Sequence, residues 1–459
     1  MFETTVGLPV WQYGEHVAAH EAVTRVLPSV RKDLERLVRV PSVSSDPGAA
    51  EHVRASAEAV ADLLRGAGLL DVEVLRVEGG QPAVVGYRPA PPGAPTVLLY
   101  AHHDVQPTGA RTDWVTDPFE PVERGGRLYG RGAADDKAGI ALHLAALRAY
   151  GDELPVGVIV LIEGEEEIGS PTLTDFLTAY RDRLRADVVV LADSTNWTVD
   201  IPALTTTLRG GVNLAVEVRT LDHGVHSGMY GGAAPDALTA LCRLLATLHD
   251  ERGDVAVAGL ARDPVPDLDL TDEQFRADAG VLDGVVLIGS RSLTARLWAG
   301  PSISITAVDA PPVARAANVL LPSARAMVSL RVAPGDDANR AAAVLAEHLQ
   351  SHAPWGAQVT VKAASAMPGY PGRTGGRAYD AAHAAFAEAW GRPAVDMGVG
   401  GTIPFIAAFV KVMPEAEILV TGVEDPDSRA HGANESLHLA MFERACVGEV
   451  LLLDLLSRS

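Results

Sequence analysis

Apolar segments alternate with amphipathic ones over the first 200 residues of the chain. Short continuous apolar runs bounded by turn residues predict buried strands, and apolar positions that repeat every three or four residues predict helices. Buried strands separated by helices favour an α/β domain with a mostly parallel sheet sandwiched by helices. The strands are expected at 71–77, 82–88, 96–104, 156–167 and 187–193, and the helices at 16–40, 50–65, 138–150 and 172–184.

The pattern changes after about residue 205. Half-buried strands and helices then follow in the order βαββαβ, which is the ferredoxin-like plan of an α+β domain able to fold by itself. A stretch at about 252–300, rich in Asp, Pro and Gly, is expected to be an irregular insertion packed over this domain. Helix–strand alternation returns towards the C-terminus. The predicted organisation is therefore a catalytic domain in two parts, 1–205 and 376–459, interrupted by a smaller inserted domain at 206–375.

Composition narrows the class of protein. The 459 residues are 47 % hydrophobic and 21 % charged, as in ordinary globular domains. Asp and Glu outnumber Lys and Arg by 59 to 38, and the net charge of −21 repels nucleic acid and anionic lipid, so neither is an expected partner. No apolar run reaches the roughly 20 residues of a membrane span. The start, MFETTVGLPVW, also lacks the features of a signal peptide, so we expect a cytoplasmic protein.

His and carboxylate residues gather where the predicted strands end. In open α/β sheets, ligands bind outside the carboxyl ends of the strands. Taken one at a time, such residues are usually solvated or cap a helix. Here, however, five separate segments bring them to one predicted edge: His102, His103 and Asp104; Glu163, Glu165, Glu166 and Glu167; Asp193; His431; and Asp135 with Asp136 in a glycine-flanked turn.

This convergence points to bound cations. Several carboxylates at one sheet edge would repel one another unless cations neutralised them, and a mixture of imidazole and carboxylate suits zinc or manganese. Cys242 and Cys446 are too few for a thiolate site or a disulfide framework. Two His and three carboxylates balance the charge of two divalent ions and one hydroxide, which predicts a two-metal hydrolytic site. The sequence contains no GxSxG elbow, which disfavours serine hydrolase chemistry.

Seven motifs then carry a family resemblance. They are YAHHDVQP, WVTDPFEP, LYGRGAADDKAG, EGEEEIGS, DHGVHSGMYGG, GGTIP and AHGANE, in this order along nearly the whole chain. Together they resemble the dinuclear zinc family of carnosinase-like dipeptidases. The wider circle of that family holds aminoacylases, glutamate carboxypeptidases and succinyl-diaminopimelate desuccinylases. The resemblance implies that the inserted ferredoxin-like domain is a lid through which two chains form a homodimer.

The resemblance also implies a role for individual residues. His102 and Asp193 would hold one divalent ion, Glu167 and His431 the other, and Asp135 would bridge both. The ions would be zinc, with manganese or cobalt as alternatives. Glu166 would be the general base, Asp104 would orient the imidazole of His102, and His226 would reach into the active site of the partner subunit to stabilise the tetrahedral oxyanion. The substrate carboxylate would be held by Arg331, Gly400, Gly401, Thr402 and Asn318.

Some of these residues can also be explained by purely structural roles. Asp104 and Asp136 can also be explained as helix caps, and Arg331 as a surface residue of a strand. The sequence also departs from the family pattern, because His103 stands where Tyr is usual and HGANE replaces the commoner HSPNE. The departure at His103, like that at Ala138, which replaces a Gly, bears on substrate choice more than on hydrolysis.

The function expected from these residues is metal-dependent hydrolysis of the amide bond of short peptides that have a free C-terminal carboxylate. The 252–300 insertion favours this dipeptidase branch, because it resembles the longer lid of dipeptidases. An N-acyl-amino-acid deacylase or carboxypeptidase of the same family is the alternative. A metal-free binding or scaffold protein is a hypothesis of another class, which the completeness of the ligand positions disfavours.

Overall fold

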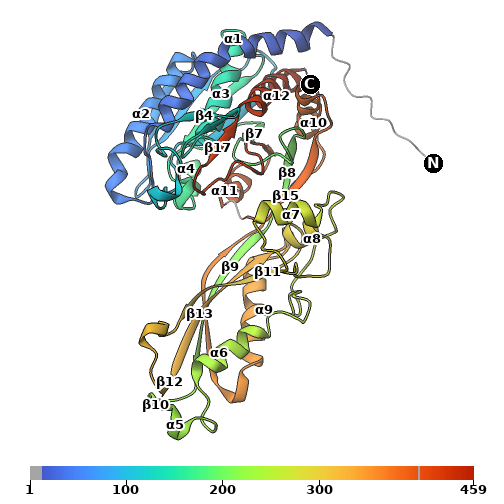
Figure 1. Cartoon of the computed structure of the whole chain (residues 1–459). Coiled ribbons are helices and arrows are strands. Elements are labelled where there is room, and N and C mark those ends of the chain that lie inside the picture. The colour runs from blue at the N-terminus through green and yellow to red at the C-terminus, as the bar shows by residue number, and fades with distance from the viewer. Residues whose placement is uncertain (1–12, 402–403, 459) are drawn as a thin grey trace, which may run out of the picture. The chain divides into compact units, whose positions relative to one another are not determined.

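The computed structural model describes residues 13–401 and 404–458, and Thr402 lies outside them. These described residues form two compact units. Unit 1 contains the chain up to Thr206 together with 373–397 and the residues from Phe405 onwards, and unit 2 contains 207–372 and 398–404. Each unit has a sheet and helices of its own, as the ribbon shows (Figure 1).

The main sheet of unit 1 is mixed. Its described strands are ordered β1-β2-β6-β3-β7-β16, and only the neighbours β6, β3, β7 and β16 run parallel to one another. The expectation of a mostly parallel sheet therefore holds for this part alone. β1 and β2 pair antiparallel because only a short loop joins them, whereas a parallel pair needs a long crossover. The strands are β1 (Leu70–Leu75), β2 (Ala83–Arg88), β3 (Thr96–His102), β6 (Gly157–Glu163), β7 (Val188–Leu191) and β16 (Glu417–Val420).

Helices cover both faces of this sheet. Leu99 and Ala101 of β3 join the core that contains α3, while the ring of Tyr100 points the other way and packs against Phe405 and Phe409 of α11, with ring centroids 4.6 and 5.4 Å apart. Alternate residues of a strand point to opposite faces, so both faces of β3 are buried. The helices of unit 1 are α1 (Tyr13–Val38), α2 (Ala50–Gly66), α3 (Lys137–Tyr150), α4 (Leu173–Ala179), α10 (Arg377–Trp390), α11 (Pro404–Val412) and α12 (Leu439–Ser457).

Outside the main sheets of the two units, the described strands are short and form three small sheets. β4 (Val122–Arg124), β5 (Arg127–Tyr129) and β17 (Ser436–His438) pair in the order β17-β5-β4. β8 (Ala203–Leu208) pairs with β15 (Val395–Val399), and β10 (Val225–His226) pairs with β12 (Val319–Leu320). None of the described helices is both long and apolar enough to cross a membrane.

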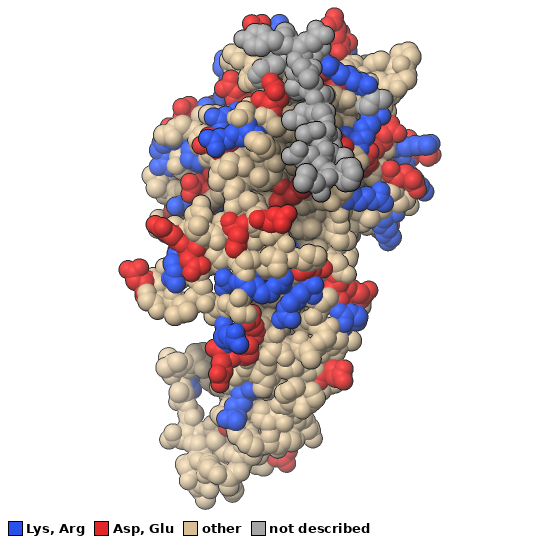
Figure 2. Space-filling view, turned by 90° about the vertical axis from the view of Figure 1, so that its right-hand side faces the viewer, with Lys and Arg blue, Asp and Glu red and all other residues tan. Residues whose placement is uncertain are grey.

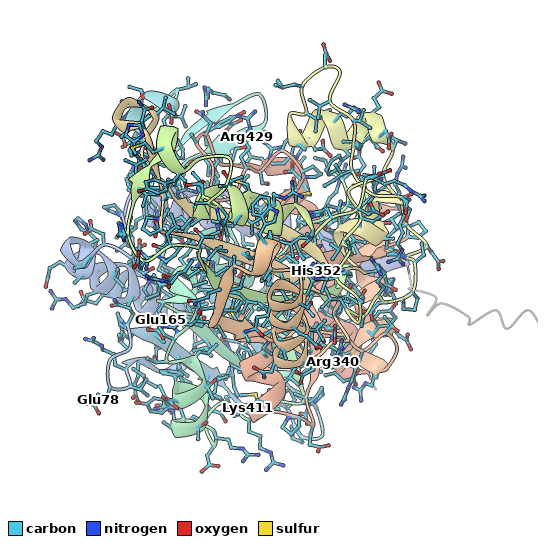
Figure 3. The ribbon with its side chains drawn as sticks, turned by 90° about the horizontal axis from the view of Figure 1, so that it is seen from below. Glu78, Glu165, Arg340, His352, Lys411 and Arg429 are labelled. Carbon is cyan, nitrogen blue, oxygen red and sulfur yellow. The ribbon has the colours of Figure 1, made fainter. Side chains whose placement is uncertain are left out.

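Unit 2 contains an antiparallel sheet packed against two helices. The described strands are ordered β11-β13-β9-β14, and along the chain the elements follow the order βαββαβ. Leu241 of α6 and Leu345 of α9 are fully buried against Val216 and Val328 of the sheet. Arg340 and His352 mark the first turn of α9 and the residue just past its end (Figure 3). The elements are β9 (Gly210–Arg219), α5 (Ser227–Tyr230), α6 (Ala237–Ala246), β11 (Ser302–Asp309), β13 (Ser323–Val332), α9 (Ala338–Ser351) and β14 (Gln358–Met367).

The 252–300 stretch is less irregular than expected. It contains two short helices, α7 (Asp272–Ala279) and α8 (Leu293–Leu297). The side chains of Thr271 and Gln274 form a reciprocal capping box at the start of α7, and Gly280 ends the helix in the left-handed conformation. These caps satisfy the backbone groups at both ends of α7, which is why a helix forms in a segment with no apolar periodicity.

Candidate metal centre

The carboxyl ends of parallel neighbouring strands bring the candidate ligands together. His102 is the last residue of β3, and Asp193 follows two residues after the end of β7. β6 leads through Glu165 into a 3₁₀ turn over Glu166–Ile168. Asp135 lies just before α3, and His431 lies in the loop between β16 and β17. Because β3, β6, β7 and β16 run in one direction, these ends share one edge of the sheet.

Asp135 joins two groups of potential metal ligands within the described residues. One group is His102, Asp135 and Asp193, the other is Asp135, Glu167 and His431, and in each the ligand atoms lie within 4.8 Å of one another. Asp135 Oδ1 lies 3.1 Å from Nε2 of His102, and Asp135 Oδ2 lies 3.1 Å from Nε2 of His431. One carboxylate thus divides its two oxygens between two imidazoles. This arrangement and the oxygen and nitrogen donors fit two divalent cations that share a bridging carboxylate.

The remaining ligand atoms lie close to the same imidazoles. Glu167 Oε2 is 3.1 Å from Nε2 of His431, and Asp193 Oδ2 is 3.9 Å from Nε2 of His102. The side chain of His102 is fully buried, whereas that of His431 is 60 % exposed. The second ligand group is therefore the one that opens to solvent.

The electrostatics of the site favour cations. Burial raises the pKa of Asp193 to about 7, and burial together with the charges of Asp193, Glu167 and Asp135 raises the pKa of Glu166 well above its usual value. Hydrogen bonds to Asp135 and Glu167 raise the pKa of His431 to about 11. Protons therefore compensate the crowded carboxylates when no metal is bound. Divalent cations at these donors would replace those protons, so metal binding should release protons.

Asp104 connects the ligand His102 to the turn that bears Glu166 and Glu167. Nδ1 of His102 lies 3.1 Å from the backbone oxygen of Asp104 and 3.4 Å from its Oδ1. The carboxylate of Asp104 accepts the backbone N–H groups of Glu166 at 3.2 Å and Glu167 at 3.1 Å. Oε2 of Glu166 lies 4.0 Å from Nε2 of His102, so the candidate base stands beside the donors without a hydrogen bond to that imidazole.

A buried ion pair that the sequence analysis missed fixes the two loops of the site. Nη1 of Arg131 donates to Oε2 of Glu435 at 2.7 Å, and Nη2 of Arg131 donates to the backbone oxygens of His431 at 3.1 Å and Gly432 at 3.2 Å. The carboxylate of Glu435 also accepts the backbone N–H of Asp135 at 3.1 Å. This pair joins the segment of the bridging carboxylate to the loop of His431. Arg131 lies in the motif LYGRGAADDKAG and Glu435 in the motif AHGANE. The presence of one basic and one acidic residue in these two motifs was the sequence signal that could have predicted the pair.

Three further residues have roles in or around the site. Asp136 caps α3 through the backbone N–H of Gly139 and also accepts the N–H of His102 at 3.2 Å. Burial lowers the pKa of His103 to about 4, and this imidazole lies 2.9 Å from the backbone oxygen of Pro82, outside both ligand groups. Glu424 was not predicted from the sequence, and burial together with the charges of Asp135 and Asp193 raises its pKa. Glu424 follows the end of β16. The expectation that ligands bind outside the carboxyl ends of the strands, which identified the other carboxylates, therefore applies to Glu424 as well.

The other predicted residues that the structure describes belong to unit 2, and none of these is part of the two ligand groups. His226 is exposed at the end of β10, where its Nδ1 accepts the N–H of Gly228 at 3.0 Å. The backbone oxygen of Asn318 accepts the N–H of Ser227, which places Asn318 beside His226. Arg331 lies in β13 opposite Ser302 of β11 and Gly211 of β9. Nε of Arg209 donates to the backbone oxygen of Gly400 at 3.2 Å, and Gly401 follows in the same loop.

The Arg131–Glu435 pair gives a test of the ligand geometry. Arg131→Met should weaken binding of the second divalent ion by about 10- to 100-fold, because the loop of His431 loses its anchor to the segment of Asp135. Isothermal titration with Zn²⁺ measures this change. Arg148→Met is the matched control, because Arg148 pairs with Asp33 at 2.7 Å on a helix outside the ligand groups. Equal Zn²⁺ affinity in both variants would show that the pair does not position the ligands.

Comparison with known proteins confirms the resemblance inferred from the motifs. A profile of peptidase family M20/M25/M40 matches residues 98–452. The cysteinylglycine-S-conjugate dipeptidase of Corynebacterium striatum is 37 % identical over 373 residues, which cover 80 % of this chain and 82 % of that protein. The Beta-Ala-His dipeptidase of Rattus norvegicus is 28 % identical over 366 residues, which cover 76 % and 74 %. The crystal structure of human carnosine dipeptidase 1 shares the fold, with a TM-score of 0.80 at 24 % identity and coverage of 97 % and 99 %. The chain therefore belongs to peptidase family M20/M25/M40.

Proposed function

We propose that this protein is a metal-dependent dipeptidase that hydrolyses the amide bond of short peptides with a free C-terminal carboxylate. The observation that carries the proposal is the shared carboxylate of Asp135, which lies 3.1 Å from an imidazole on either side. Relatives named as dipeptidases, which match most of this chain, support the choice of a peptide substrate.

We infer that His102 and Asp193 hold one divalent ion, Glu167 and His431 the other, and Asp135 both. Zinc suits this donor set, and manganese or cobalt are the alternatives. Two such ions would polarise the scissile carbonyl and lower the pKa of a bound water. Glu166 would take a proton from the attacking water and pass it to the leaving amine. Its position supports this role, because Oε2 of Glu166 lies 4.0 Å from Nε2 of His102 while Glu166 belongs to neither ligand group, which leaves its carboxylate available to the proton.

We propose that unit 2, at about residues 206–375, is a lid and dimerisation domain inserted between the catalytic parts 1–205 and 376–459. Exposed apolar side chains surround His226 at one end of unit 2: Met229 is 75 % exposed, Tyr230 52 % and Val319 45 %. This end of the unit shows few charged side chains on the face drawn in Figure 2. An uncharged patch of this kind suits contact with a second copy of the chain. His226 would then stabilise the oxyanion in the partner's active site.

The substrate carboxylate is proposed to bind to Arg331, with Gly400, Gly401 and Thr402 around it. Asn318 lies beside His226, at the other end of β13, and is proposed to reach the carboxylate from the partner subunit together with His226. A guanidinium is the cation best suited to a carboxylate, because it offers two parallel hydrogen bonds. The alternative activity, removal of an acyl group from an acylated amino acid, needs the same carboxylate contact. The two activities must therefore be distinguished by comparing turnover of the two classes of substrate.

A substrate panel tests the proposed activity. The Zn²⁺-loaded protein should hydrolyse unmodified dipeptides with a higher kcat/KM than N-acetyl or N-succinyl amino acids, as measured by release of free amino acid. Chelation should remove the activity, and added Zn²⁺ or Mn²⁺ should restore it. A higher kcat/KM on the acylated amino acids would replace the dipeptidase by a deacylase.

The role of Glu166 has its own test. Glu166→Gln should lower kcat by about two to four orders of magnitude, because the amide cannot accept the proton of the attacking water. Its metal content, measured by mass spectrometry, should stay near that of the unchanged protein, since Glu166 is not part of either ligand group. Glu163→Gln is the matched control on the same segment. Retained activity in Glu166→Gln would exclude this residue as the base.

The proposed action of His226 in the partner's site is tested by mixing. His226→Ala and Glu166→Gln should each be inactive as separate homodimers. Co-refolded or co-expressed, they should regain up to about a quarter of the unchanged activity, because some mixed dimers contain one complete site. Analytical ultracentrifugation checks that the His226→Ala variant still forms dimers. Absence of any regained activity in verified mixed dimers would mean that each site is completed by its own chain.

A further inference from the structure

Unit 2 contains a cavity of about 430 Å³ in the segment that the sequence analysis treated as an irregular insertion. Its walls come from α7, α8, the start of β11 and the loop at 281–291, and these elements lie side by side in the yellow part of Figure 1. A volume of this size is typical of pockets that bind small molecules. The ligand groups of the metal centre lie in unit 1, and none of their residues lines this cavity.

Much of the wall is apolar and part of it faces water. Phe275 of α7 and Ile303 of β11 line the cavity together with Val285, Val286 and Ile288 of the loop. Val286 is 80 % exposed and Ile288 66 %. Burying these side chains under a ligand would be favourable, at about 25 cal/mol per Å² of apolar area.

Hydrogen bonds fix the loop that forms this wall. The N–H of Gly289 donates to the backbone oxygen of Arg252 at 2.7 Å, and the N–H of Ser290 donates to Oδ1 of Asp254 at 3.1 Å. Nη2 of Arg276 donates to the backbone oxygen of Val285 at 2.8 Å. Hydrogen bonds to neighbouring segments therefore fix the loop that bears the apolar side chains of the wall.

The cavity is also rich in positive charge. Among the described residues that line it, Asp254 is the one carboxylate, beside four arginines: Arg209, Arg262, Arg291 and Arg296. Arg262, Arg291 and Arg296 donate to backbone oxygens and form no ion pair with a described carboxylate. In a chain with a net charge of −21, such a group of cations in an apolar cavity indicates an anionic ligand.

Two of the guanidinium groups converge at Gly300. Nη1 of Arg209 lies 3.4 Å from the backbone oxygen of Gly300 and 2.9 Å from Oγ of Ser302. A Cβ atom on Gly300 would lie only 3.4 Å from Nη1 of Arg291. That Nη1 is buried and has no hydrogen-bond partner among the described residues. Burial and the charge of Arg331 lower the pKa of Arg209 to about 10, and a bound anion would oppose both effects.

We propose that this cavity binds an amphipathic carboxylate. Its apolar body would lie against Phe275, Val286 and Ile288, and its carboxylate would pair with Arg291 and Arg209. The arginines of the wall supply the positive charge for the carboxylate, and the apolar walls select against small hydrophilic anions. A free fatty acid and an acylated amino acid both have this chemistry.

Binding is measured by isothermal titration of the full-length, Zn²⁺-loaded protein with three probes: decanoate, N-decanoylglycine and decanol. At least one of the two carboxylates should bind, and decanol should bind at least about tenfold more weakly, since it lacks the charge that pairs with arginine. Tighter binding of decanoate identifies free acids as the source of the ligand, and tighter binding of N-decanoylglycine identifies acylated amino acids. Equal binding of decanol, or no binding of either carboxylate, overturns the proposal.

Two variants on different walls locate the binding. Arg291→Met should weaken carboxylate binding about tenfold without changing that of decanol, because it removes the charge and keeps the length of the side chain. Ser304→Phe should abolish binding of all probes, because the ring fills the cavity from an exposed position on β11. Arg325→Met is the matched control, since Arg325 is a 67 % exposed arginine of the same unit that pairs with Asp309. Unchanged carboxylate binding in both cavity variants would overturn the proposed location.

The outcome does not depend on the proposed dipeptidase activity. Glu166→Gln and removal of metal by a chelator should leave carboxylate binding within about twofold of the unchanged protein, because the cavity shares no residue with the ligand groups. Loss of carboxylate binding on metal removal would show that the probe binds at the metal centre and would refute a separate site.

Discussion

The carboxylate of Asp135 is the group on which the site depends. Its two oxygens each lie 3.1 Å from an imidazole, one belonging to His102 at the end of a strand and one to His431, which follows Asp135 by 296 residues in the chain. The neighbouring Asp193, Glu166 and Glu167 are partly or fully buried, and burial disfavours their ionised forms. Cations at the two ligand groups would remove this electrostatic cost, so the charge of the site and its capacity for metal have one cause.

Residues that face away from the ligand atoms hold this geometry. Arg131 and Glu435 join the segment of Asp135 to the loop of His431 through the backbone, and Asp104 accepts two backbone N–H groups of the turn that bears Glu166. These segments are rich in glycine and have little conformational preference of their own. Hydrogen bonds between charged side chains and backbone groups therefore fix the conformation of these loops, as backbone hydrogen bonds fix that of the strands.

The two units differ in their electrostatic character. The site in unit 1 concentrates carboxylates, whereas the cavity in unit 2 concentrates arginines against apolar walls. Near His226, the side chains of Met229, Tyr230 and Val319 expose apolar surface. Each region is thus suited to a different class of partner: divalent cations, an amphipathic anion and a second protein surface.

The sequence by itself determined the strands of the two larger sheets, most of the helices and the candidate ligands, because apolar runs and the residues that end them are local features. It placed His102 and Asp193 at strand ends, which parallel strands bring to one edge whatever their order in the sheet. It did not determine the antiparallel pairing of β1 and β2. That pairing depends on the edge of the parallel strands to which the β1–β2 hairpin adds. The sequence pattern also predicted an irregular segment at 252–300, although the Thr271–Gln274 capping box was a readable local signal.

Only the tertiary structure decided which polar residues act together. Glu435 and Arg131 are 304 residues apart in the chain, and their pairing follows from the packing of two loops that share no periodicity. The place of Glu424 near the site arises in the same way. A sequence pattern reports the environment of one segment at a time. Contacts between side chains of distant loops depend on the geometry of the whole fold, which no single segment contains.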